Sequence, residues 1–94
     1  MVPIAYVVHR TRGRLRVRTP DRRGHPEWLQ SQAAAVAQLA GVDQVQIGLA
    51  TGSLVIHHRL SHHSLLEEAL RTLDGWDWQA TPPPPPSPLV VLKE

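Results

Sequence analysis

Residues 13–19 read GRLRVRT, and this stretch decides the fold because apolar and charged residues alternate along it without a break. Successive side chains of a β-strand point to opposite faces, so Leu15 and Val17 share one face. The opposite face carries three arginines, Arg14, Arg16 and Arg18. The stretch therefore predicts a sheet that is covered by helices on one face and open to solvent on the other.

The preceding residues 4–9, IAYVVH, also have the composition of a strand. Their apolar side chains at Ile4, Tyr6 and Val8 fall on even positions, whereas those after Gly13 fall on odd positions. The chain must therefore bulge or turn between the two segments, and Gly13 is the residue suited to it. We therefore expect one long strand that is interrupted at Gly13.

Two helices and a hairpin are predicted after this strand. The first helix begins at Pro26 and ends before Gly41, because apolar residues recur at helical spacing between them. Alternating apolar residues on both sides of residues 50–52 predict an antiparallel hairpin. A second helical pattern starts at Ser61 or at Ser64 and stops at residues 74–75, and residues 76–80 supply a short last strand. The residues expected beneath the helices are Leu15, Val17, Val45, Ile47, Leu54 and Ile56.

The resulting order is strand, helix, strand, strand, helix, strand. It predicts the α+β class with the ferredoxin-like βαββαβ layout, a four-stranded antiparallel sheet with two helices on one face. We assign residues 1–80 to this domain, residues 81–88 to a proline-rich linker and residues 89–94 to a short apolar tail.

The tail has two interpretations. Five consecutive prolines hold four apolar residues away from the domain, which suits a docking peptide like those that load cargo proteins into shells. The same residues also suit a disordered terminus, or a tip that packs back on its own domain or on a neighbouring copy. The residues concerned are Leu89, Val90, Val91 and Leu92.

Composition excludes several classes of function. The chain has no cysteine, so disulfides and thiolate metal sites are excluded. No apolar run approaches the ~20 residues that a membrane-spanning helix needs, so we expect a cytoplasmic protein that does not insert into membranes. No nucleophile, base and oxyanion site can be assembled from the sequence, which indicates a protein that is not an enzyme.

Several short motifs resemble those of heavy-metal-associated domains. They are GRLRVR at residues 13–18, LAGV at 39–42, TGSLVI at 51–56 and DGW at 74–76. Within that family the chain resembles the cysteine-free variety, because residues 21–26, DRRGHP, replace the Met-x-Cys-x-x-Cys loop. The resemblance implies a role in metal homeostasis, as a metal carrier or as an accessory that docks to a metal-transporting P-type ATPase.

Histidines and one carboxylate provide the candidate metal ligands. His9, Asp21 and His25 could meet near the loop that follows the first strand, where they would suit Fe, Zn, Ni or Cu(II). Residues 57–63, HHRLSHH, supply a secondary set. Since His57 and His58 point to opposite faces of a strand, at most one of them can join the others, and we assign the set to His58, His62 and His63.

The arginine side of the sheet is the second candidate site. Arg14, Arg16, Arg18 and His57 could bind an anionic partner or nucleic acid, or they could serve only as a solvated outer face. RNA-recognition motifs share this topology but stack bases on aromatic rings, and aromatic residues make up 4% of this chain. Binding of nucleic acid by stacking is therefore disfavoured.

Overall fold

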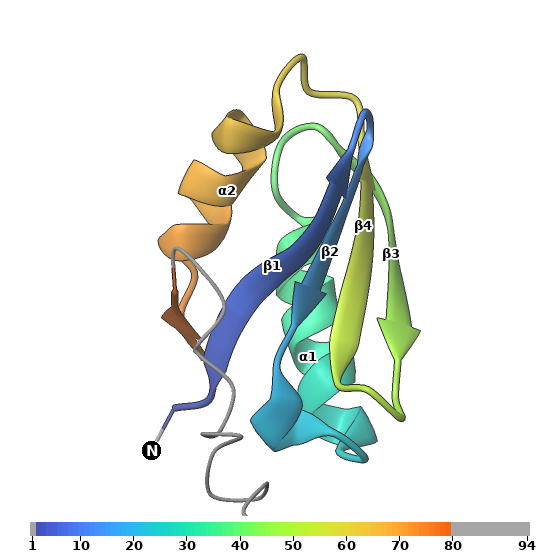
Figure 1. Ribbon diagram of the computed structural model, residues 1–94, viewed down its shortest axis with the longest axis vertical. Helices are drawn as coiled ribbons and strands as arrows, with labels where there is room; N and C mark the ends of the chain where they lie inside the picture. The colour runs from blue at the N-terminus through green and yellow to red at the C-terminus, as the bar shows by residue number, and fades with distance from the viewer. Residues whose placement is uncertain (1, 80–94) are drawn as a thin grey trace, which may run out of the picture.

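The computed structural model describes residues 2–79, so the proline-rich linker and the apolar tail lie outside the described residues. The elements are β1 (Ile4–Thr11), β2 (Arg14–Arg18), η1 (Pro20–Arg22), α1 (Pro26–Ala37), β3 (Val42–Gly48), β4 (Ser53–His58), α2 (His63–Arg71) and β5 (Asp77–Trp78). The five strands form one sheet in the order β3-β4-β2-β1-β5, and the two α-helices lie against one face of it (Figure 1). Among residues 2–79, no helix is long and apolar enough to cross a membrane.

The expected single interrupted strand is wrong, because the chain reverses at Gly13. Gly13 has a φ of 77°, and the strands on either side of it pair antiparallel from Thr11 with Arg14 to Tyr6 with Arg18. Alternation alone cannot distinguish a bulge from a tight turn, since both can place a glycine between two strands. The bulge lies instead between Val7 and His9.

The α+β class is confirmed, but the four-stranded antiparallel layout is not. The additional strand β1 lies between β2 and β5 and separates them. As a result β5 pairs with β1, and this pairing is parallel, with Ile4 opposite Asp77 and Ala5 opposite Trp78. The sheet is therefore mixed and five-stranded, while the predicted neighbours β2 and β4 do pair antiparallel.

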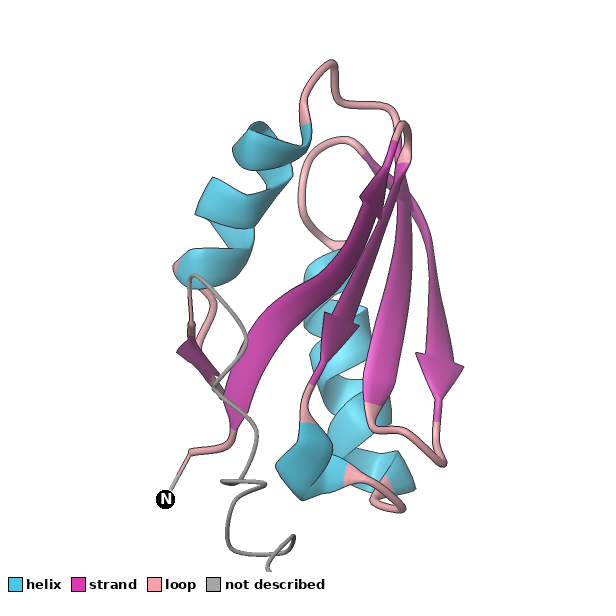
Figure 2. Cartoon of the chain, viewed as in Figure 1, coloured by secondary structure: helices cyan, strands magenta, loops and turns pink. Residues whose placement is uncertain are grey.

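The hydrophobic core lies between one face of the sheet and both helices. Figure 2 is viewed from the opposite, uncovered face, so α1 lies behind the strands. Four of the six side chains expected beneath the helices are fully buried. Val45 is only partly buried, and Ile47 is 39% exposed because both lie on the edge strand β3. On β1 the core residues are Ala5 and Val7, not the even-numbered residues expected from the sequence.

A close contact fixes the end of β2 against the β3–β4 turn. The backbone N–H and the hydroxyl of Thr19 both donate to the carbonyl oxygen of Gly52, at 2.6 and 2.8 Å. Thr19 is fully buried, and Gly52 has a φ of 66°. A Cβ atom on Gly52 would lie 2.5 Å from the backbone oxygen of Thr19, so only glycine fits this approach.

We predict that Gly52→Ala destabilises the protein more than Gly24→Ala does. Both glycines have positive φ, at 66° and 74°, so both substitutions carry the cost of about 1 to 2 kcal/mol for a left-handed backbone. Only Gly52 adds a clash with backbone, because a Cβ on Gly24 meets nothing within 4 Å among the described residues. Urea unfolding of both variants measures the difference. Equal losses of stability would show that the Thr19 contact can relax.

Candidate functional site

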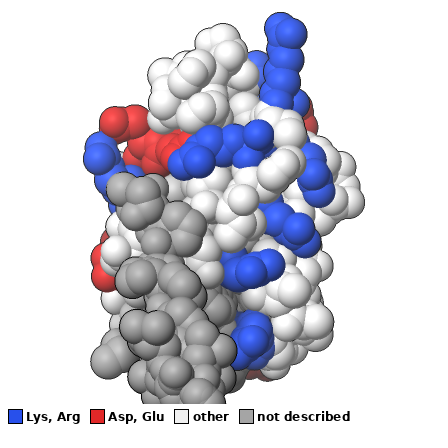
Figure 3. Space-filling view, in the orientation of Figure 1, with Lys and Arg blue, Asp and Glu red and all other residues white. Residues whose placement is uncertain are grey.

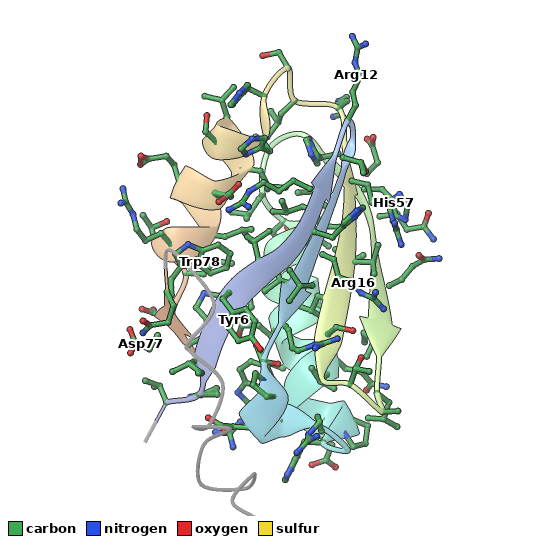
Figure 4. The ribbon with its side chains drawn as sticks, viewed as in Figure 1. Tyr6, Arg12, Arg16, His57, Asp77 and Trp78 are labelled. Carbon is green, nitrogen blue, oxygen red and sulfur yellow. The ribbon has the colours of Figure 1, made fainter. Side chains whose placement is uncertain are left out.

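The uncovered face of the sheet carries the arginines of β2. Arg14 lies opposite His57 of β4, and Arg16 lies opposite Val55. These side chains point away from the helices, because the intervening residues Leu15 and Val17 are buried in the core. We call Arg14, Arg16, Arg18, Val55 and His57 the arginine face, and Figure 4 labels Arg16 and His57 on it. The sequence-based prediction of this face is confirmed in its geometry.

The arginines do not all extend freely into solvent. Arg16 and Arg18 are half-buried, and the Nε atom of each is shielded from solvent without a hydrogen-bond partner among the described residues. Val55, which lies between Arg16 and Gln46 in the sheet, is only 8% exposed. Arginine side chains commonly cover apolar surface with their aliphatic stems while the guanidinium stays in water. The arginine face is thus a partly apolar surface with cationic groups along it.

The charges of the arginine face are not neutralised within residues 2–79. The ion pairs in this part of the chain join Arg10 and His63 to Glu67, Arg59 to Asp43 and Arg71 to Glu68. None of them includes an arginine of β2. Figure 3 shows basic side chains spread along this side of the molecule, with acidic ones gathered mainly beside α2. An acidic partner could therefore bind these three cations without displacing a carboxylate of the described residues.

His57 adds a hydrogen-bonding group at the β3 side of the arginine face. Its Nε2 atom lies 3.2 Å from Oε1 of Gln46 on the neighbouring strand. The contact orients the ring along the sheet and leaves Nδ1 as the ring nitrogen available for a ligand. The sequence predicts His57 on this face, and the structure places it there beside Arg14.

The first set of candidate metal ligands is not assembled. His9 lies on β1 opposite Arg16, Asp21 lies in η1, and His25 occupies the N-cap position of α1. Within residues 2–79 there is no group of three or more His, Asp or Glu side chains that could hold a metal ion. The reversal at Gly13 explains the difference, because it pairs His9 with β2 instead of directing it toward the loop.

The histidines of residues 57–63 are likewise engaged in local contacts. Nδ1 of buried His58 accepts a hydrogen bond from the backbone N–H of Leu60 at 3.2 Å. Nδ1 of His62 accepts from the backbone N–H of Ser64 and caps α2. Nδ1 of His63 lies 2.7 Å from Glu67. These rings stabilise the entry to α2 and do not form a metal group in this conformation.

Sequence reasoning missed an ion pair that joins β1 to α2. Arg10 follows the bulge and points to the helix side, where its Nε and Nη2 atoms donate to the two carboxylate oxygens of Glu67 at 2.8 and 3.0 Å. The hydrogen bond from Arg10 lowers the pKa of Glu67, burial opposes this change, and His63 adds to the lowering. Arg10 was hidden in the sequence because it stands within a run of alternating arginines.

Comparison with known proteins finds no relative of this chain. No family model matches the chain, and no curated protein or solved structure matches it. The resemblance to heavy-metal-associated domains therefore remains a prediction from the motifs.

We predict that Glu67→Gln removes part of the acid sensitivity of the fold. A lowered carboxyl pKa stabilises the folded state above the ordinary value of 4.5, and this stability is lost as the pH falls through the lower folded value. The midpoint of thermal unfolding, followed by circular dichroism, should fall less steeply below about pH 5 in the variant than in the wild type.

Glu68→Gln is the matched control, because Glu68 is the next residue and forms an exposed pair with Arg71. Its acid profile should stay parallel to that of the wild type, since exposed pairs contribute little. Identical profiles for Glu67→Gln and the wild type would contradict the assigned role of Glu67.

Proposed function

We propose that this protein is a non-enzymatic binding module whose arginine face docks an acidic segment of a partner protein. The observation that carries the proposal is the row of three β2 arginines with no ion-pair partner within residues 2–79. Alternate residues of a strand are ~6.5 to 7 Å apart, a spacing that also separates alternate side chains of an extended peptide. Arginine binds side-chain carboxylates through two parallel hydrogen bonds.

An acidic protein segment fits the arginine face better than a nucleic acid does. Modules that bind single-stranded nucleic acid combine cationic groups with aromatic rings on which the bases stack. On this face the inner strands β4, β2 and β1 carry one aromatic ring besides imidazoles, that of Tyr6 opposite Arg18, and a single ring is a poor platform for stacking several bases. Val55 beside Arg16 is already covered, so the groups that a partner meets on this face are mainly the guanidinium groups of β2.

The family resemblance supplies one instance of such a partner. An accessory that docks to a metal-transporting ATPase needs a protein-binding face and does not itself need a metal site. A carrier role, by contrast, requires a metal site. Because no group of metal ligands is assembled within residues 2–79, those ligands would have to come together when the metal binds. The proposed docking role does not depend on the choice between these family functions.

Arg16→Gln is expected to weaken binding of a labelled oligoglutamate peptide by about tenfold, the effect of losing one charge-assisted contact. Fluorescence anisotropy on the untagged protein measures the affinity. The affinity of the wild type should also fall as salt is added, because the contacts lie at an exposed face. An oligonucleotide of equal charge should bind no tighter than the peptide.

Arg71→Gln is the matched control, since it removes one positive charge from α2, away from the arginine face. It should leave peptide affinity within about twofold of the wild type. If both variants lose affinity equally, binding reports only net charge and the proposed face is wrong. A much tighter complex with the oligonucleotide would assign the face to nucleic acid.

A further inference from the structure

A second cationic site lies at the other side of the sheet, where the β1–β2 turn approaches the start of α2. A hollow of about 400 Å³ opens there between the turn, the end of β4 and the first residues of α2. Two arginines and three histidines contribute to its lining, and no acidic residue does. They are Arg10, Arg12, His58, His62 and His63. The hollow is separate from the arginine face, because Arg10 and His58 lie on the helix side of the sheet.

His58 determines which kind of ligand this hollow suits. The residue is only 5% exposed, and its Nε2 atom has no hydrogen-bond partner among residues 2–79. Its Nδ1 atom accepts from the Leu60 N–H, so in the neutral ring the hydrogen must be on Nε2. Nε2 is therefore a donor that requires an acceptor. A metal ion needs the opposite tautomer, which would break the contact with Leu60.

The remaining groups also favour an anion. Arg12 is exposed at the turn, and Arg10 keeps its Nη1 nitrogen outside the pair with Glu67. The N-terminus of the nine-residue helix α2 adds the positive end of its dipole. The lining comes from the β1–β2 turn, the end of β4 and the start of α2, so an anion with several acceptor oxygens can contact more than one of these segments. We infer that this hollow binds a phosphate group.

Inorganic phosphate is the first probe, added to the labelled full-length protein at constant ionic strength and followed by amide chemical shifts. We expect saturable shifts at Gly13, Leu60 and Ser64. Long-range nitrogen spectra should place the hydrogen of His58 on Nε2 before and after phosphate is added. Adenosine monophosphate is the second probe, and tighter binding than inorganic phosphate would identify a nucleotide as the source of the group.

Two pairs of variants test the residues. Arg12→Gln and His58→Leu should each weaken phosphate binding by about tenfold, because each removes one donor. Arg71→Gln and His25→Leu change the same residue types outside both the hollow and the arginine face and should leave the affinity unchanged. Arg12 is exposed, so its variant keeps the test valid even if His58→Leu alters folding.

Three results would overturn the inference. They are the absence of saturable shifts with either probe, equal losses in the control variants, and zinc binding that requires His58 and moves its hydrogen to Nδ1. The first would exclude a site, the second would indicate general charge attraction, and the third would assign the hollow to a metal.

Discussion

The antiparallel pairing of β2 with β4 is the interaction on which the rest of the structure depends. In this register Leu15 meets Ile56 and Val17 meets Leu54, and all four side chains are completely buried. The same register sets Arg14 beside His57 and Arg16 beside Val55 on the other side. Because a shift of one residue would exchange the two faces, the hydrophobic core and the arginine face are fixed by one constraint.

Electrostatic organisation differs between the two sides of the sheet. On the helix side Arg10 has a carboxylate partner, and the resulting ion pair connects β1 to α2. On the uncovered side the arginines of β2 have no acid near them in the described part of the chain, although Arg16 and Arg18 are half-buried. A paired cation supports the fold, whereas an unpaired cation on a partly apolar surface is available to a partner.

Much of the fold could be predicted because the periodicity of apolar residues in the sequence matches the burial of those residues in the folded protein. Alternation identified β2 and β4, and helical spacing identified the stripe of α1 that contains Leu29 and Val36. The reversal at Gly13 could not be predicted, because a glycine between two extended segments is compatible with both a bulge and a turn. The insertion of β1 into the sheet follows from that reversal and depends on pairing between distant residues.

The candidate sites show the same division. The arginine face needed only the two-residue period of a strand, so the placement of its residues on one face could be predicted from the sequence. The sets of metal ligands required histidines from separate segments to meet, and sequence proximity within residues 57–63 does not determine where the rings point. His58 illustrates the point, because its ring turns into the helix side and bonds to the backbone of Leu60.

The bulge in β1 also affects how the sheet ends. Strand β5 pairs only with Ile4 and Ala5, so within residues 2–79 no strand covers the outer edge of β1 beyond them. Open edges recruit further strands and lead to aggregation unless they are irregular or charged. The extra residue after Val7 increases the local twist, and Arg10 and Arg12 place charge along the same segment. An irregularity that leaves the pairing with β2 intact thereby disfavours edge-to-edge association at this part of β1.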